Sequence, residues 1–142
     1  MRDLVTILLV EDNTDDATLT ERALRQGISA RLEIASDGQE ALDYLSDDAN
    51  EIPRLVLLDL RLPSVNGLEV LRRIRELDRT RLIPVVIVTN SAAPGDVAAA
   101  YRYGTNSYIR KPVDFDQFAE LIRLIGSYWL LANEPPPNMP EH

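Results

Sequence analysis

The sequence predicts one α/β domain, a doubly wound parallel sheet of five strands with five helices. Five short apolar runs alternate with five helix-like segments along the 142 residues, and this repeated order is typical of a parallel sheet with helices on both faces. The runs are rich in Val, Ile and Leu, and three are apolar throughout, as strands covered on both faces are. A chain of this length has room for one substantial core.

The strands are expected at residues 4–10, 31–36, 55–59, 84–89 and 107–110. Capping residues followed by apolar positions at helical spacing predict helices between them, beginning near residues 14, 37, 67, 94 and 114. The first helix should end at Gly27. Pro94 and Gly104 fit the first position and the stop of a short, Ala-rich helix.

The last helix is expected to run to about Leu131. We therefore expect residues 1–131 to form the domain, with an extended last helix. Residues 132–142 are expected to form a tail, whose three consecutive prolines cannot pack as a helix. No effector domain is expected, so any output would depend on contacts with other proteins.

The composition argues against several kinds of chemistry. The chain has no cysteine, which excludes disulfides and thiolate zinc sites, and its one histidine is the last residue, His142. The net charge of -8 argues against nucleic-acid binding, which needs clustered Lys and Arg. No apolar stretch approaches the roughly 20 residues of a membrane span. We expect a cytoplasmic protein that binds neither nucleic acid nor membrane.

Polar side chains follow or end four of the predicted strands. They are Glu11, Asp12, Asp59, Thr89 and Lys111. Ligands of a doubly wound sheet bind beyond the carboxyl ends of its strands, so these side chains should meet at one edge. Three clustered carboxylates need a cation, and oxygen ligands without His or Cys favour Mg²⁺. The set predicts phosphoryl chemistry on a carboxylate, with the metal and the ammonium neutralising the transferring group.

Four motifs in this order resemble the receiver domain of two-component response regulators. They are Leu-Val-Glu-Asp-Asn at 9–13, Leu-Leu-Asp-Leu-Arg-Leu-Pro-Ser-Val-Asn-Gly at 57–67, Pro-Val-Val-Ile-Val-Thr at 84–89 and Gly-Thr-Asn-Ser-Tyr-Ile-Arg-Lys-Pro at 104–112. The resemblance covers roughly residues 5–129. It implies the strand order 2-1-3-4-5 and a single-domain regulator in a phosphorelay. Such a protein is a phosphoacceptor that takes part in phosphotransfer and autodephosphorylation rather than an enzyme.

The resemblance also implies the roles of the acids. Asp59 would be phosphorylated from the phosphohistidine of a sensor histidine kinase. Mg²⁺ would be held by Asp12, Glu11, Asp59 and the main-chain carbonyl of Arg61. Glu11 stands where Asp is commoner in the family, and its longer side chain suggests contact through water. Asp12 is therefore the expected direct ligand.

Further roles are implied beyond the metal site. Thr89 and Lys111 would contact phosphoryl oxygens, and Tyr108 would be the aromatic switch whose rotamer follows Thr89. The Lys111–Pro112 peptide would be cis, a form that only X–Pro bonds adopt at small cost. The alternatives to these roles are a solvated surface lysine for Lys111, a simple strand-end hydroxyl for Thr89 and a half-buried strand aromatic for Tyr108.

The sequence opposes three alternative functions. A phosphatase with an aspartate nucleophile would have a second Asp at Asp-x-Asp, but the sequence reads Asp59, Leu60, Arg61. A receiver-like module that works by binding alone is opposed by the intact acids, threonine and lysine. A flavodoxin-type nucleotide protein would need a phosphate-cradling loop after the first strand, and none is present.

The last helix carries two apolar stripes where one would suffice for packing. The first comprises Phe115, Phe118, Ile122, Ile125 and Trp129, and the second Leu121, Leu124, Tyr128 and Leu131. We expect the first stripe to pack on the sheet and the second to form an exposed patch, which usually marks an interface. A homodimer through this helix is the prediction, and a tail folded over the patch is the alternative.

Two short stretches, residues 89–91 and 128–130, together with the short tail, also resemble stand-alone receivers paired with phytochrome-type histidine kinases. This resemblance implies a bacteriophytochrome as the partner kinase. A shuttle in a phosphorelay and a chemotaxis-like regulator are the alternatives that the sequence leaves open.

Overall fold

The computed structural model describes residues 4–137, and it has the predicted α/β architecture. The five strands are β1 (Thr6–Val10), β2 (Arg31–Ala35), β3 (Leu55–Leu58), β4 (Val85–Thr89) and β5 (Ser107–Arg110). They pair in parallel in the order β2-β1-β3-β4-β5. The five α-helices are α1 (Thr14–Gly27), α2 (Gly38–Ser46), α3 (Gly67–Glu76), α4 (Pro94–Arg102) and α5 (Phe115–Ser127).

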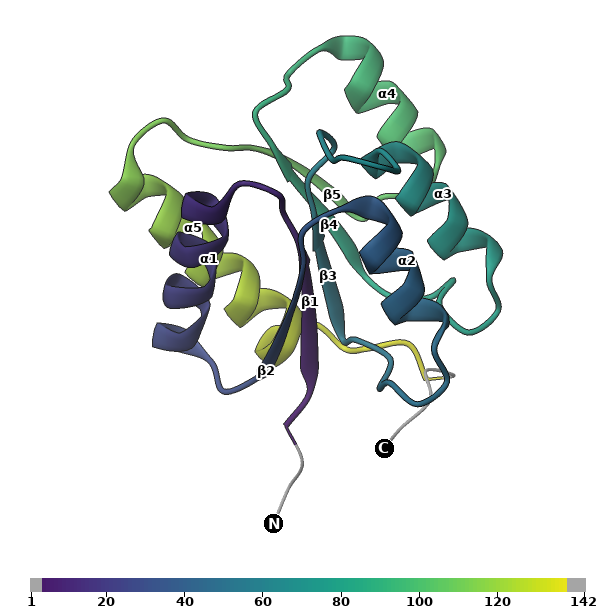
Figure 1. Cartoon of the computed structure of the whole chain (residues 1–142). Coiled ribbons are helices and arrows are strands. Elements are labelled where there is room, and N and C mark those ends of the chain that lie inside the picture. The colour runs from purple at the N-terminus through teal and green to yellow at the C-terminus, as the bar shows by residue number, and fades with distance from the viewer. Residues whose placement is uncertain (1–3, 138–142) are drawn as a thin grey trace.

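The helices cover the sheet in two layers, with α1 and α5 on one face and α2, α3 and α4 on the other (Figure 1). Successive strand residues point to opposite faces. In β1, Ile7 and Leu9 belong to the core beside α1 and α5, whereas Leu8 and Val10 belong to the other core. Both faces of the central strands are therefore buried, which explains why their sequences are continuously apolar.

Side-chain caps fix where the helices begin. Asn13, Asp37, Asn66 and Asp114 each accept a hydrogen bond from a backbone amide in the first turn of the helix that follows. A cap of this kind satisfies an amide that has no partner within the helix. Four of the five α-helices begin at such a cap, and the residues between each strand and the helix that follows form loops at one edge of the sheet.

The end of α5 differs from the expectation. Tyr128–Ala132 continue the helix as a wider π turn, and the Asn133 amide donates to Tyr128 O at 2.6 Å.

Two residues of the apolar stripes of α5 lie differently from the expectation. Phe115, expected to pack on the sheet, is 69% exposed because it is the first residue of α5 and directly follows the exposed Val113–Asp114 segment. Leu121, expected in the exposed patch, is half-buried against the core beside α1.

The exposed stripe of α5 is therefore Leu124, Tyr128 and Leu131. These three side chains are 62%, 53% and 72% exposed. The described part of the Pro-rich tail, up to Pro137, forms no helix beyond Ala132. Among residues 4–137, no helix has the length and apolar character needed to cross a bilayer.

Gly67 allows α3 to begin against the backbone that directly follows β3. Its amide donates to Leu60 O at 3.0 Å. A Cβ at this position would lie 2.2 Å from Asp59 O and 2.6 Å from Leu60 Cα. These are backbone atoms that cannot move without shifting Asp59 itself, so the glycine serves close approach rather than chemistry.

We therefore expect Gly67→Ala to lower the free energy of unfolding by about 2 kcal/mol or more, because the added methyl group overpacks a rigid contact. Gly95→Ala is the matched control, since nothing lies within 4 Å of a Cβ there. In α4 that change should raise stability by at most about 1 kcal/mol. Urea unfolding measures both, and equal stabilities for the two variants would contradict the packing argument.

Candidate functional site

The acids of the site follow directly after β1 and β3. Backbone hydrogen bonds continue the sheet past both strand ends, from the Glu11 amide to Ala35 O at 3.0 Å and from the Asp59 amide to Val10 O at 3.1 Å. The sheet therefore fixes the backbone of both acids. Because neighbouring parallel strands end at the same edge, Glu11, Asp12 and Asp59 face one another as predicted.

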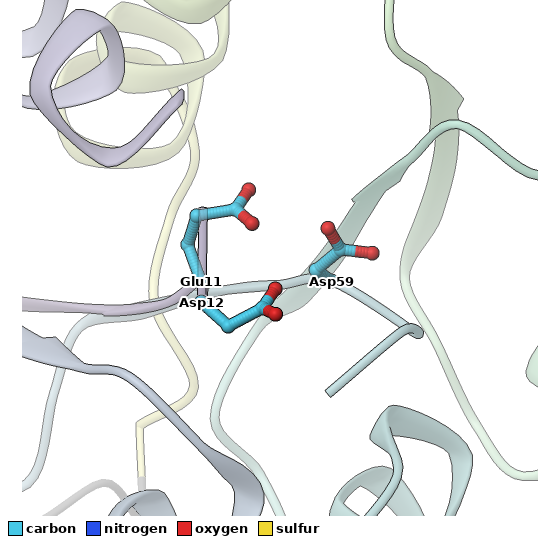
Figure 2. A group of neighbouring side chains, drawn as sticks. All are labelled: Glu11, Asp12 and Asp59. Atoms are coloured by element: carbon cyan, nitrogen blue, oxygen red, sulfur yellow. The ribbon is translucent and has the colours of Figure 1, made fainter. Parts of the chain in front are cut away.

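Figure 2 shows the Glu11 and Asp12 side chains extending toward Asp59. Each of the three residues offers a carboxylate oxygen, and these oxygens lie within 4.8 Å of one another. Glu11 and Asp59 are only 5% and 6% exposed, whereas Asp12 is exposed. Three carboxylates this close repel one another, and an oxygen-only donor set of this kind fits a hard divalent cation.

A buried lysine partly neutralises this cluster. The Lys111 Nζ atom donates to Glu11 Oε1 at 2.7 Å, to Asp59 Oδ2 at 2.9 Å and to Asp16 Oδ2 at 2.8 Å. Its side chain is 4% exposed, and its amide donates to Thr89 O at 2.7 Å, which extends the sheet beyond β5. The alternative of a solvated surface lysine is therefore wrong.

Burial and hydrogen bonding act in opposite directions on the pKa of Glu11 and on that of Lys111, and the net result is a raised pKa for both groups. Burial raises the pKa of the Glu11 carboxyl to about 7, although the hydrogen bond from Lys111 works against the rise. Burial alone would lower the pKa of Lys111, but hydrogen bonds to Asp16, Glu11 and Asp59 outweigh it and raise the pKa. The lysine is therefore a permanent cation of the site.

Asp16 is a site residue that the sequence analysis missed. It lies in the first turn of α1, where an acidic residue is already explained by the cap and the helix dipole. The sequence feature that could have identified Asp16 is its spacing from Asp12, because it follows that residue by four positions at the same edge of the sheet. Three carboxylates thus bond one ammonium, and Asp12 lies close to two of them.

Thr89 and Tyr108 do not bond directly to each other, but both contact Ser91. The Ser91 amide donates to Thr89 Oγ1 at 3.4 Å, and the Tyr108 hydroxyl donates to Ser91 O at 2.8 Å. Thr89 is fully buried at the end of β4. Ser91 Oγ in turn donates to Asp96 in the first turn of α4. A chain of contacts therefore connects the site to α4 and β5.

The backbone of Arg61 lies beside the Asp59 carboxylate, whereas its side chain points elsewhere. The Arg61 amide donates to Asp59 Oδ1 at 3.1 Å. Its side chain is 76% exposed, and the guanidinium lies 3.9 Å from Asp96 Oδ2. The role of the Arg61 carbonyl as a metal ligand stays a prediction, and its adjacency to Asp59 is consistent with it.

The predicted cis bond between Lys111 and Pro112 is wrong, because no peptide bond within residues 4–137 is cis. The trans form of an X–Pro bond is preferred by about 0.5–1 kcal/mol. A difference this small cannot be decided from the residue types alone. Lys111 reaches the carboxylates with the trans bond.

Chemically, the site presents a nucleophile in a charged, partly enclosed setting. Both oxygens of Asp59 accept hydrogen bonds, one from the Arg61 amide and one from Lys111. These contacts hold both oxygens of the carboxylate in place, and a carboxylate oxygen can attack an electrophile. The adjacent ammonium is placed to stabilise negative charge on a group that Asp59 attacks.

Comparison with known proteins agrees with this description. Residues 7–123 match the family described as "Response regulator receiver domain". The chain is 46% identical over 134 residues to the probable methanogenesis regulatory protein FilR2 of Methanothrix harundinacea, covering 92% of this chain and 86% of that protein. It is 36% identical over 129 residues to the response regulator Rcp1 of Synechocystis sp., covering 87% and 88% of the two chains.

Solved structures show the same fold. The Mn²⁺-bound form of Rcp1 matches with a TM-score of 0.88 and 34% identity, covering 93% of this chain and 99% of that one. The phosphorylated cyanobacterial phytochrome response regulator RcpA matches with a TM-score of 0.88 and 34% identity, covering 94% and 99%. The strand order 2-1-3-4-5 and the five helices are confirmed, and the chain belongs to the response regulator receiver domain family.

Proposed function

We propose that this protein is a cytoplasmic response regulator that accepts a phosphoryl group on Asp59 from a sensor histidine kinase. It signals through changed protein–protein contacts. The observation that carries the proposal is the buried Asp59 carboxylate, which lies between the Lys111 ammonium and two further acids. The protein is then a phosphoacceptor that takes part in its own phosphorylation and dephosphorylation, with no separate substrate to turn over.

In the transfer step, an Asp59 oxygen attacks the phosphorus of the kinase phosphohistidine. The new P–O bond forms as the P–N bond breaks, and the bonding electron pair leaves on the imidazole nitrogen. Lys111 donates to Asp59 Oδ2 at 2.9 Å, so its ammonium is in place to offset the charge on the transferring group. The Arg61 amide holds the other oxygen and limits rotation of the carboxylate.

Mg²⁺ is the proposed cofactor, because oxygen ligands fit it and the three carboxylates need a cation. Asp12, Asp59 and the Arg61 main-chain carbonyl would hold it directly. Glu11 would act through water, since Oε1 already accepts from Lys111 and Oε2 accepts from the Asn13 amide at 3.2 Å. When bound, the ion would neutralise charge between the carboxylates and the phosphoryl group.

The route from phosphorylation to output is proposed to run through Thr89 and Tyr108. A phosphoryl group on Asp59 offers new acceptors to the Thr89 hydroxyl, which now accepts from the Ser91 amide. Movement of that loop would change the acceptor of the Tyr108 hydroxyl, which is Ser91 O. The exposed surface around α4 and β5 would then differ between the two states.

A phytochrome-type kinase is the proposed partner. The support is similarity, since RcpA is described as a phytochrome response regulator and shares 34% identity over nearly the whole chain. FilR2, which is more identical in sequence, is described as a probable methanogenesis regulator. A kinase outside light sensing is therefore the second candidate, and phosphotransfer from purified kinases of both kinds distinguishes them.

We further propose a homodimer through α5. Leu124, Tyr128 and Leu131 form an exposed apolar stripe that runs from α5 into the π turn. A second copy can cover this stripe with the same stripe, as a two-fold interface requires. Leu121, half-buried at its margin, would contribute its remaining exposed surface.

The phosphoacceptor is tested with radioactive acetyl phosphate. The native protein should incorporate label with Mg²⁺, and both EDTA and Asp59→Asn should abolish it, because each removes a part that the transfer requires. Asp48→Asn is the matched control, since Asp48 is 95% exposed in the segment that precedes β3, away from the site. Equal labelling of the native protein and Asp59→Asn would exclude Asp59 as the acceptor.

The dimer is tested by sedimentation velocity at tens of micromolar. The native chain should sediment as a dimer, and Leu124→Glu combined with Leu131→Glu should sediment as a monomer that still labels at Asp59. Leu77→Glu is the control, because this residue is 42% exposed at the end of α3 on the other face. A native monomer in both phosphorylation states would overturn the proposed dimer.

A further inference from the structure

Asp16 contacts the site without belonging to the group that would hold a cation. Its Oδ2 atom lies 2.8 Å from Lys111 Nζ. The three carboxylates whose oxygens lie within 4.8 Å of one another are those of Glu11, Asp12 and Asp59. A metal or phosphoryl group would therefore also interact with two of the three partners of Lys111, namely Glu11 and Asp59. It would not interact with the third, Asp16.

The backbone of Asp16 is held firmly. Asn13 caps α1, and its Oδ1 accepts from the Asp16 amide at 2.9 Å. The Asp16 side chain is 26% exposed, so it is partly shielded by the structure around it. The contact joins two segments 95 residues apart in the sequence, the start of α1 and the end of β5.

Lys111 needs such a partner because its side chain is long. A lysine carries an ammonium on four flexible methylene groups, and much rotamer freedom is lost when it is fixed in one place. An ammonium has three N–H groups, and all three are used, by Glu11, Asp16 and Asp59. If a bound cation attracted the carboxylates of Glu11 and Asp59, Asp16 alone would still accept a hydrogen bond from Lys111.

We propose that Asp16 is a positioning residue that anchors the Lys111 ammonium, so that one N–H group stays directed at the phosphoryl position beside Asp59. The anchoring follows from the contacts above, and its consequence for phosphorylation rests on the proposed function. An ordinary surface ion pair would contribute little. This pair differs because the lysine end is 4% exposed and shares its charge among three acids.

Loss of the Asp16 carboxylate should weaken binding of a phosphoryl analogue more than binding of Mg²⁺. Asp16→Ala should lower the labelling rate and the affinity for beryllofluoride, a phosphoryl analogue, by about tenfold, the effect of losing one hydrogen bond to a charged group. Mg²⁺ affinity without the analogue should fall by only about two- to threefold, as for the loss of one partly screened charge outside the ligand group. Asp16→Asn keeps an acceptor oxygen at the same reach and should retain most of the native rate.

The chain offers a direct probe of the anchoring, because Lys111 is its only lysine. Labelling with ¹⁵N-lysine therefore gives one side-chain ammonium signal in an NMR spectrum. Three hydrogen bonds should slow its proton exchange and make the signal visible in the native protein. It should broaden beyond detection in Asp16→Ala and persist in Asp16→Asn.

Asp15→Ala is the matched control. Asp15 is the neighbouring acid in the same first turn of α1, and it is exposed. Its loss removes the same charge and the same helix-dipole contribution, so signal and labelling should stay native. A native signal in Asp16→Ala would overturn the anchoring, and so would an equal loss in Asp15→Ala.

The two readouts also separate this proposal from the proposed function. If the native protein does not label at Asp59, the phosphoacceptor proposal fails, and the ammonium spectrum still decides whether Asp16 anchors Lys111. If labelling is Asp59-dependent but equal in Asp16→Ala, with the signal lost, the anchoring is real and its role in phosphorylation is rejected. Thermal unfolding of each variant confirms that the comparison is between folded proteins.

Discussion

One buried ammonium allows four carboxylates to share the carboxyl edge of the sheet. Lys111 bonds Glu11, Asp16 and Asp59 at 2.7–2.9 Å, and Asp12 completes the acidic group. These acids come from the segments after β1 and β3 and from α1. The lysine therefore joins three parts of the chain, and the shape of the site depends on this contact.

The parallel sheet makes this concentration of charge possible. Apolar strands that are buried on both faces end together, and the ladder of backbone hydrogen bonds continues into Glu11, Asp59 and Lys111. Burying charges carries a desolvation cost that an ion pair only partly offsets. The two apolar cores supply the stability that tolerates this cost, and the charge left over after Lys111 favours a bound cation.

Much of the fold and the site could be predicted, because both rest on patterns local in sequence. Continuous apolar runs predicted the strands, and their polar ends predicted Glu11, Asp12, Asp59 and Lys111 at one edge. Asp16 was missed for a physical reason. An acid in the first turn of a helix is favourable without any partner, so its sequence context does not reveal a distant contact.

The errors concern features set by small energies or by tertiary placement. The trans bond before Pro112 differs from the cis form by only about 0.5–1 kcal/mol. Helical spacing placed Phe115 with the buried stripe of α5, but the first turn of a helix can extend past the core that the later turns cover. Likewise, Leu121 packs against the core beside α1, because the packing of α5 on its neighbours, which helical spacing does not show, sets which flank of the stripe is buried.

The most direct test of this account is the free energy of unfolding of Lys111→Met in EDTA. Methionine keeps the length of the side chain and removes the charge, which leaves buried carboxylates without their counter-ion. The account predicts a loss of about 3 kcal/mol relative to the native protein, with much of it recovered when Mg²⁺ supplies the missing positive charge. A Lys111→Met protein as stable as the native one in EDTA would show that the ammonium is not what holds the acids together.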